Sequence, residues 1–399
     1  MCLQEVEEDK FFQVFQPEFR RLGFSGVFKK RTGEKRDGCA IFYRDQCFQL
    51  EKHCSVEYYQ PGVYLLDRDN IGLIVILKSK LVPSKLCVAT THLLFNPKRG
   101  DVKLAQLSKL FAEIDKVSYE TSENGEGHCP IILCGDFNSE PNSPLYRFIV
   151  NAFLDYSNMF SGDVCRPLGS SNPQKRGFQI RAPLLPKNLG ITRSCQYVDV
   201  VEQRNGLQEQ STAGEGKCED KRGRNKGCEA KIQVKHPGSS SGPPQQVGDQ
   251  LPSLIPKASG NAGARASSSK VAVEAIAVGR TAASSTSSGS VEQAQGSSKN
   301  QHNPPKHELH HNLDIESSYQ LHDGLTTTHH CRTNCVVDFM FHSRPRKSGN
   351  ISDLKKVAWL PLFTDFESNE MGGLPNKHWS SDHYRLQVKF MLCPPSTKP

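Results

Sequence analysis

The segment Ile131–Ser139, with the sequence IILCGDFNS, is the part of this chain that most clearly indicates its fold class. Its apolar start predicts a buried strand over Ile131–Phe137. The polar residues Asp136 and Asn138 emerge where this strand ends, at a sheet edge, which is where α/β proteins place their functional sites. The alternative interpretation is a turn that only closes the strand, because Gly, Asp and Asn all favour turns.

Further strands and helices are predicted on both sides of this segment. Apolar runs rich in Ile, Val, Leu and Cys predict short buried strands at Cys39–Tyr43, Gly72–Leu77, Leu86–Leu94, Val336–Phe341 and Tyr384–Leu392. Apolar residues at spacings of three and four predict a helix over Val102–Tyr119, which Asp101 can cap, and a short helix over Pro144–Val150. Phe11–Leu22 is predicted to form a further amphipathic helix, which Pro17 interrupts. This alternation predicts an α/β protein.

A long polar segment separates two blocks that can form a core. The chain has 399 residues, of which 20 are Phe, 10 Tyr and 2 Trp, yet none of these occurs from Val198 to Ser318. The sequence from 202 to 312 is rich in Ser, Gly, Gln and Lys, and it cannot bury enough apolar surface to offset the entropy of ordering. We therefore predict a disordered polar insertion at 202–312 within one domain, whose two parts are 1–201 and 313–399.

Charge, hydropathy and cysteine usage exclude several classes of protein. The net charge of +8 is compatible with a polyanionic substrate but is far from that of a DNA-coating tail. No apolar run reaches the roughly 18 residues of a membrane span, and the first residues lack a signal-peptide pattern. We therefore expect a protein of the cytoplasm, with the nucleus as a second location, whose 14 cysteines are reduced. A zinc site in His329-His330-Cys331-x-x-x-Cys335 is not favoured, because no second ligand pair accompanies it.

Five short polar motifs stand at the ends of the predicted strands. They are Leu3-Gln4-Glu5-Val6, Thr91-His92, Gly135-Asp136-Phe137-Asn138-Ser139, Val337-Asp338-Phe339 and Ser380-Ser381-Asp382-His383. Each motif alone could be a turn, a strand residue or a surface pair. Together, several carboxylates, two histidines and an Asn suit the hydrolysis of a phosphate ester by water that a metal ion activates. Oxygen ligands suit Mg²⁺, or Mn²⁺ as the alternative, better than zinc.

In this order the motifs resemble the endonuclease/exonuclease/phosphatase superfamily, in its carbon-catabolite-repressor and nocturnin branch. A closer similarity to the Angel proteins of that branch rests on Cys2–Val6, Arg31–Gly33, Asp37–Ile41, Leu66–Gly72 and Thr91–Asp101. The resemblance implies an α/β fold of two packed β-sheets flanked by helices, a four-layer sandwich of the DNase I type. It also implies hydrolysis at the 3′ ends of mRNA or tRNA, with removal of 2′,3′-cyclic phosphate as the main expectation. The alternatives are a 3′–5′ exoribonuclease (a poly(A) deadenylase) and a catalytically impaired RNA-binding adaptor.

The resemblance also implies a role for residues that match the family's motifs. Glu5 would be the main ligand of the metal ion, and Asp382 would assist it. Asp136 would align or deprotonate the attacking water, and Asn138 would hold the scissile phosphate. His92 would stabilise negative charge on the phosphoryl oxygens.

The remaining candidates would act through a second side chain or on the RNA itself. Asp338 would orient His383, which would contact the phosphate as an acid or a base. The candidates for substrate binding are Asn70, Asn96, Lys98 and Arg99. Asn70 could equally be a turn residue at a strand start. For the basic cluster Lys29, Lys30, Arg31, Lys35 and Arg36 we favour a solvated hairpin loop over an RNA contact.

One departure from the family's pattern lies at the start of the sequence. Relatives carry a strand upstream of the Glu5 motif, and it ends in an Asn that helps to position the metal ion. Here Met1 stands three residues before Gln4, so we expect either a fragment of a longer protein, which we favour, or an impaired enzyme.

Overall fold

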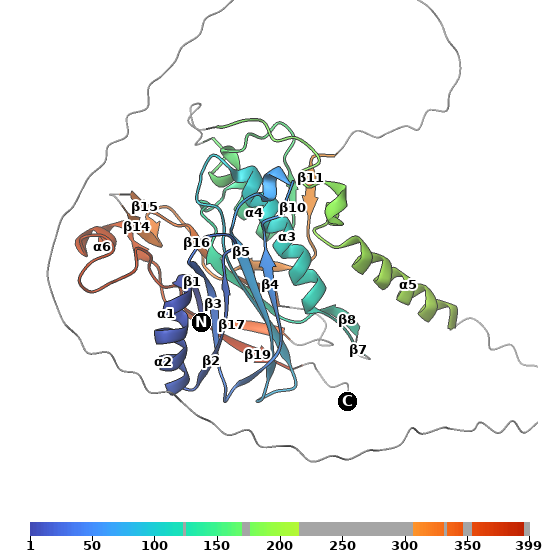
Figure 1. Cartoon of the computed structure of the whole chain (residues 1–399), viewed down its shortest axis with the longest axis horizontal. Coiled ribbons are helices and arrows are strands. Elements are labelled where there is room, and N and C mark those ends of the chain that lie inside the picture. Colours follow the sequence, from blue (N-terminus) through green and yellow to red (C-terminus); the bar gives the residue numbers. More distant parts are fainter. Residues whose placement is uncertain (123–124, 170–175, 215–305, 331–332, 346–352, 395–399) are drawn as a thin grey trace, which may run out of the picture. The chain divides into compact units, whose positions relative to one another are not determined.

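The computed structural model describes residues 1–122, 125–169, 176–214, 306–330, 333–345 and 353–394 (Figure 1). Met1–Lys217 and His302–Pro399 form one compact unit, so the blocks before and after the polar segment share it. Within the described ranges, no helix has the length and apolar character that crossing a membrane requires. Among the cysteines that the structure describes, none forms a disulfide.

A six-stranded sheet forms the centre of the unit. Its strands are β4 (Phe48–Glu57), β5 (Ile71–Ser79), β6 (Lys85–His92), β9 (Ile131–Asp136), β12 (Ile315–Ser317) and β16 (Asp338–Ser343). They lie in the order β12-β16-β9-β6-β5-β4, and only β6 and β9 are parallel. The apolar runs that predicted strands follow from this position, because a strand covered on both faces needs apolar side chains on both. Leu73 and Val75 of β5 pack toward a second sheet, whereas Ile74 and Ile76 pack toward helices.

The second sheet and an outer helical layer complete one side of the fold. The strands β1 (Cys2–Glu7), β3 (Asp37–Arg44) and β2 (Phe24–Lys30) lie in the order β1-β3-β2. Cys39 and Ile41 of β3 pack against β5 and β6, and Phe42 packs on the opposite face. That face is covered by α1 (Glu8–Lys10), a π-helical segment η1 (Phe11–Phe15) and α2 (Gln16–Arg21). Pro17 lies in the first turn of α2, where its missing N–H group costs little.

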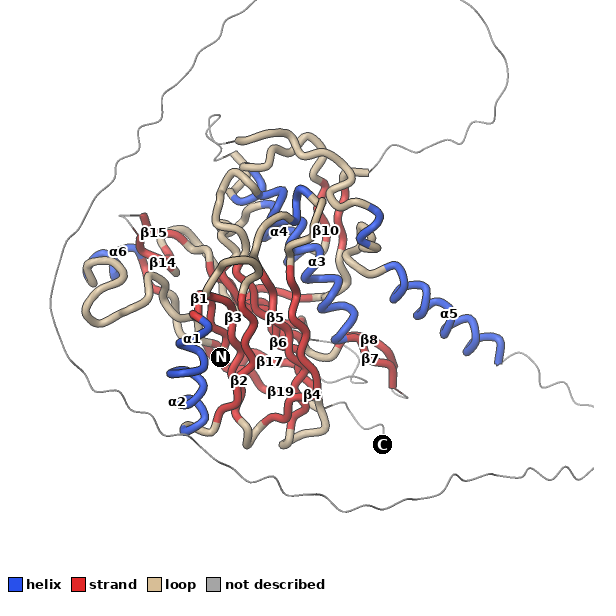
Figure 2. The backbone as a smooth tube through the Cα atoms, viewed as in Figure 1, coloured by secondary structure: helices blue, strands red, loops and turns tan. Residues whose placement is uncertain are grey.

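Two helices cover the other face of the central sheet. They are α3 (Gly100–Ser118) and α4 (Pro144–Asn151), which begins after the capping residue Ser143. Figures 1 and 2 show α1 and α2 on one side of the strands and α3 with α4 on the other. These four layers, helix, sheet, sheet and helix, confirm the predicted fold class. Asp101 is not the predicted cap of α3: it lies inside the first turn and accepts a hydrogen bond from Nε of Arg99 at 3.0 Å.

The shorter elements surround this sandwich. They are η2 (Tyr64–Leu66), β7 (Tyr119–Ser122), β8 (Gly125–His128), β10 (Phe153–Asp155), η3 (Asp163–Cys165), η5 (Lys187–Leu189), α5 (Val198–Gly214), β11 (Glu308–His310), β13 (Leu325–Thr326), β14 (Thr328–His330), β15 (Thr333–Cys335), β17 (Asp353–Trp359), β18 (Phe363–Thr364), α6 (Asp365–Glu370) and β19 (Val388–Cys393). β17 pairs with β19, and Leu354, Phe390 and Leu392 of this pair join the core between the two sheets.

Several predicted boundaries differ from the observed ones. The predicted insertion, 202–312, has regular elements at both ends, because α5 runs to Gly214 and β11 pairs with β10. Leu309 of β11 is buried in the core, which a composition average over a long window conceals. The rest of that segment, 215–305, lies outside the described residues. The last strand begins at Val388 and not at Tyr384. The hydroxyl of Tyr384 instead forms a hydrogen bond with Ser368 of α6.

Candidate active site

Strand register brings three of the predicted residues together where neighbouring strands of the central sheet end. His92 ends β6 and Asp136 ends β9, and these two residues are Cα partners in the parallel ladder. Asp338 begins β16, and it is the Cα partner of the same Asp136 in the antiparallel ladder. Residues that are far apart in the sequence therefore become neighbours because their strands end together at this position.

Gly135 allows the two parallel strands to approach at this point. A Cβ atom on Gly135 would lie 2.1 Å from the carbonyl oxygen of Thr91, and the φ angle is +153°. Any side chain here would push β9 away from β6 and separate Asp136 from His92. The glycine of the motif is therefore a requirement of the backbone and not only a turn signal.

Asn138 holds the carboxylate of Asp136 in place. Its backbone N–H donates to Oδ1 at 2.7 Å, and its side-chain Nδ2 donates to Oδ2 at 3.2 Å. Nδ2 also donates to the carbonyl oxygen of Leu93 at 3.1 Å. Both N–H bonds of the amide are therefore used within the protein, so in this structure Asn138 positions Asp136, and its predicted contact with the scissile phosphate stays a prediction. Its φ of 49° is left-handed, a conformation that Asn tolerates well.

Asp338 and His383 form a hydrogen-bonded pair beside Asp136. Nδ1 of His383 lies 2.7 Å from Oδ2 of Asp338, and the hydroxyl of Thr327 donates to the same oxygen at 2.7 Å. Within the described residues, Asp136, Asp338 and His383 offer ligand atoms that all lie within 4.8 Å of one another. This group does not include the predicted metal ligands Glu5 and Asp382.

Glu5 approaches the site from the second sheet. Its Oε1 lies 3.7 Å from Nδ1 of His92, whose Nε2 lies 3.4 Å from Oδ2 of Asp136. A bulge in the pairing of β1 with β3 falls between Leu3 and Val6, and Glu5 has a φ of 55°. Such a conformation is uncommon for Glu and is typical of functional positions. The Glu5 side chain is 66% exposed, so its carboxylate is available to a ligand.

Burial and neighbouring charges shift the pKa values of three of these groups. Burial, with the charge of Asp338 beside it, raises the pKa of Asp136 to about 8. Burial also lowers the pKa of His92, although the nearby Glu5 opposes this shift. For His383 burial acts in the same direction, but the hydrogen bond and charge of Asp338 outweigh it and raise the pKa to about 9. Shifts of opposite sign within one cluster are typical of catalytic sites.

Comparison with known proteins identifies the family of this site. The sequence profile of the Endonuclease/Exonuclease/phosphatase family matches residues 1–383. The chain belongs to this family. It is similar to angel homolog 2 of Homo sapiens, with 32% identity over 409 residues, which covers 98% of the chain and 60% of that protein. It is also similar to angel homolog 1 of Rattus norvegicus, with 48% identity over 206 residues, 50% of the chain and 30% of that protein. The chain thus spans between 30% and 60% of the length of these curated relatives.

A solved structure shows that this similarity extends to the backbone fold of the chain. The crystal structure of ANGEL2, described as a 2′,3′-cyclic phosphatase, aligns with a TM-score of 0.64 and 31% identity. The alignment covers 98% of the chain and 80% of that structure. A second crystal structure of ANGEL2, in complex with adenosine-2′,3′-vanadate, aligns equally well.

Two residues that support the site were not predicted from the sequence. Lys103 of α3 is fully buried, and its ammonium group donates to the carbonyl oxygen of Asn138. Gln106 accepts the N–H of Leu94 at 3.1 Å and donates to Oδ1 of Asn70 at 3.3 Å. The signal that could have found them is their polarity at buried positions of a helix that is otherwise apolar on that side.

The predicted substrate-binding residues lie around the site and not within it. Asn70 is buried and donates from Nδ2 to the carbonyl oxygen of His92 at 3.1 Å, so it positions that histidine. Asn96 closes a turn, because its Oδ1 accepts the N–H of Lys98 at 2.9 Å. Lys98 is exposed in the loop that follows β6. The guanidinium of Arg99 is held by Asp101.

Three further predictions concern residues at the margins. The carbonyl oxygen of Asp382 accepts the hydroxyl of Thr328 at 2.8 Å, which fixes the backbone just before His383. In the basic cluster, Lys29 and Lys30 end strand β2, and the loop begins only after them; Lys29 pairs with Glu57 and Arg31 with Asp37. The disfavoured zinc site includes Cys331, which lies outside the described residues.

Proposed function

We propose that the chain is a metal-dependent phosphoesterase that removes 2′,3′-cyclic phosphate from the 3′ ends of RNA. The observation that carries this proposal is the similarity, over 98% of the chain, to a structure described as a 2′,3′-cyclic phosphatase. It is supported by the site, where Asp136, Asp338 and His383 present ligand atoms within 4.8 Å of one another.

Enzymes of this family generally depend on divalent metal ions, and the donors around this site fit such an ion. The exposed carboxylate of Glu5 and the buried carboxylates of Asp136 and Asp338 supply oxygen atoms, which Mg²⁺ and Mn²⁺ prefer. We propose that the ion is Mg²⁺ and that Glu5 holds it, with Asp382 in support. When bound, it would supply positive charge to the phosphate and lower the pKa of water.

The protein's own residues then divide the remaining tasks. Asp136, held through both oxygens by Asn138, is placed to orient water and to accept its proton. His92 and His383 flank this carboxylate and can donate hydrogen bonds to phosphoryl oxygens. Asp338 fixes the ring of His383 through Nδ1, which leaves Nε2 directed away from Asp338 and toward a ligand.

The test is a substrate panel with the full-length protein in Mg²⁺. RNA that ends in 2′,3′-cyclic phosphate should be hydrolysed, whereas poly(A) should stay intact, and Asp136→Ala should abolish the reaction. Asp323→Asn is the matched control, because Asp323 is exposed and lies outside the site. Folded, metal-loaded protein that releases AMP from poly(A) would support a deadenylase instead. Protein that binds RNA without turnover of either substrate would support the adaptor alternative.

We also propose that the substrates are the 3′ ends of mRNA or tRNA and that the protein acts in the cytoplasm, with the nucleus as a second location. Substrate ends recovered after crosslinking in cells, together with fractionation, would test both statements.

A further inference from the structure

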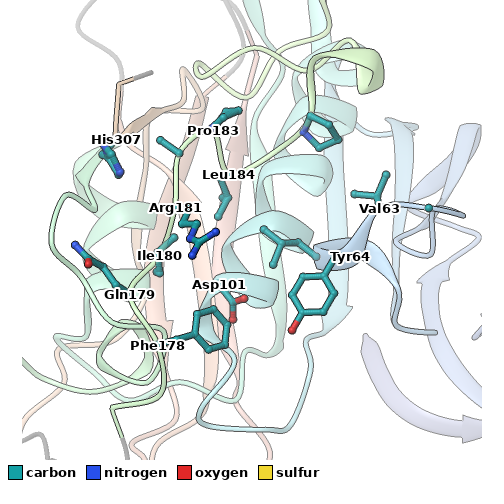
Figure 3. Close-up of a pocket in the computed structure, with 14 residues that line it drawn as sticks. Val63, Tyr64, Asp101, Phe178, Gln179, Ile180, Arg181, Pro183, Leu184 and His307 are labelled. Carbon is teal, nitrogen blue, oxygen red and sulfur yellow. The ribbon is translucent and has the colours of Figure 1, made fainter. Parts of the chain in front are cut away.

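A cavity at the start of α3, the helix whose Lys103 supports the proposed active site, has no part in the mechanism above. Its volume is about 1070 Å³, and it is lined by two loops, Gly62–Leu65 and Phe178–Leu184, together with the start of α3 (Figure 3). Asp101 of α3 lies on its wall, and Lys103, two residues further along, holds the carbonyl oxygen of Asn138 in the site. The second loop is tied to the first turn of α3 through Ser161. The N–H of Ser161 donates to the carbonyl oxygen of Phe178 at 2.8 Å, and its carbonyl oxygen accepts the N–H of Gly100 at 2.9 Å.

Two exposed aromatic rings stand at this cavity. The ring of Tyr64 is 63% exposed and that of Phe178 is 45% exposed, although large aromatic side chains are usually covered. Between them lies the guanidinium of Arg99, 4.9 Å from the centroid of Tyr64 and 5.7 Å from that of Phe178. Nε and Nη2 of Arg99 donate to Asp101, so the cation is fixed and the rings are held against it. The rings are therefore prearranged, with Arg99 over one face of each, and both side chains stay largely exposed to solvent.

The free charge at the cavity is positive. Asp101 is neutralised by Arg99, to which it is bonded through both oxygens. Arg181 extends into the middle of the cavity in Figure 3, and among the described residues it has no ion-pair or hydrogen-bond partner. Lys98 is exposed in the loop before α3, and its carbonyl oxygen accepts the hydroxyl of Ser161 at 2.7 Å, which joins that loop to the segment around Ser161.

Flat rings beside free cations suit one ligand class, single-stranded nucleic acid. Bases stack on aromatic side chains regardless of sequence, and arginine and lysine bind the phosphates between them. We propose that Tyr64, Phe178 and Arg181 bind the RNA segment on the 5′ side of the terminal nucleotide. This inference rests on the proposed function, because it assumes that the 3′ end occupies the site beside Asp136. It makes the enzyme selective for chains of several nucleotides over free cyclic nucleotides.

The experiment separates this binding from the chemistry. A fluorescent single-stranded RNA of eight nucleotides with a 3′-hydroxyl, which offers no cyclic phosphate, is titrated with full-length protein and followed by anisotropy. Tyr64→Ala and Phe178→Ala should each weaken binding by roughly five- to hundredfold, the range found when a stacking residue is removed. Tyr64→Phe should restore it, because the ring is kept. Arg181→Gln should reduce the dependence of log K on log salt by about 0.7, as expected for one lost phosphate contact on a single strand.

Kinetics on substrates of two lengths complete the test. The Tyr64→Ala, Phe178→Ala double variant should raise KM for a cyclic-ended octanucleotide and leave turnover of a cyclic mononucleotide unchanged. Phe12→Ala is the control, because Phe12 is 54% exposed on the outer helical layer. Wild-type affinity and KM in the double variant would overturn the inference and assign the cavity to another ligand. A different result would contradict the proposed function alone. In that case the wild-type protein turns over no cyclic substrate, although its RNA binding still depends on the two rings.

Discussion

Oδ2 of Asp338 accepts two hydrogen bonds, one from Nδ1 of His383 at 2.7 Å and one from the hydroxyl of Thr327 at 2.7 Å. The bond from Thr327 fixes the carboxylate, and the fixed carboxylate then orients the imidazole ring of His383. Asp338→Asn should therefore misorient His383 and lower kcat by about 10²–10⁴-fold, with KM nearly unchanged. Steady-state kinetics on cyclic-ended RNA measures both constants, with Asp323→Asn as the control. A variant that changes KM alone would show that Asp338 binds substrate instead.

Glu5→Gln tests the proposed metal ligand. The amide keeps the shape of the side chain but loses the charge that attracts a divalent cation, so half-maximal activity should need at least about tenfold more Mg²⁺. Activity measured across a Mg²⁺ titration checks this, and saturating Mg²⁺ should restore most of it. Glu7→Gln, one exposed carboxylate further along β1, should leave the titration unchanged. Equal Mg²⁺ dependence in Glu5→Gln and the wild type would remove Glu5 from the metal site.

Lys103→Met tests whether the buried ammonium group of Lys103 fixes the backbone of Asn138. The change removes a charged donor from a buried carbonyl oxygen and keeps the length of the side chain, so the free energy of unfolding should fall by about 1–3 kcal/mol. Asn138 should lose its fixed position, and kcat should fall with it. Urea unfolding and kinetics measure the two effects. Lys116→Met, at an exposed position in the last turn of the same helix, should change neither.

Gly135→Ala should disrupt the pairing of β6 with β9. The new methyl group would lie 2.1 Å from the carbonyl oxygen of Thr91, so backbone must move, and we expect a loss of more than about 3 kcal/mol of stability. Gly62→Ala is the matched control, because Gly62 also has a positive φ, of +77°, but no atom lies within 4 Å of the added carbon. It should cost only about 1–2 kcal/mol. Similar thermal unfolding of the two variants would contradict the close approach of the strands.

His311 should make stability depend on pH. Its ring is buried, and Nε2 lies 3.0 Å from the carbonyl oxygen of Phe148 while Nδ1 accepts the N–H of Leu313 at 3.3 Å. Burial lowers the pKa of His311 from 6.5 to about 4. The unfolded chain therefore binds the proton more tightly, so this stabilisation is complete above pH 6.5 and is lost as pH falls toward 4. The loss should reach about 3 kcal/mol, the difference between the two pKa values expressed as free energy.

Urea unfolding at pH 7.5 and pH 5 checks this dependence. His311→Gln should flatten it, because the neutral amide has no proton to gain. His322→Gln should leave it as it is in the wild type, because His322 is exposed. An unchanged slope in His311→Gln would assign the pH dependence to other groups.

The central strands could be predicted because their sequences reflect burial on both faces. Ile71–Ser79 and Ile131–Asp136 are almost entirely apolar, and the polar residues that follow or end such runs lie at the sheet edge. β4 was missed for the opposite reason: it is the edge strand of its sheet, and most of its side chains are polar and exposed. The short pair β10 and β11 was missed because its partners come from opposite sides of the polar segment.

The site was predictable in its residues but not in its connections. His92, Asp136 and Asp338 each lie within a predicted strand and His383 directly before one, and register alone brings the first three together. The bond from Thr327 to Asp338 involves a short strand region that carries no periodic signal. The two bonds from the Asn138 amide are a property of local backbone geometry, and no spacing of residues in the sequence reveals them.

The pairing of β16 with β9 has a consequence for synthesis of the protein. Asp136 leaves the ribosome well before Asp338 and His383, and the whole polar segment is made in between. Until β16 arrives, β9 remains an unpaired edge and the carboxylate of Asp136 has no partner across it. If the proposed function holds, a nascent chain therefore lacks the complete site until β16 is made, and one that stops before β16 leaves the β9 edge unpaired.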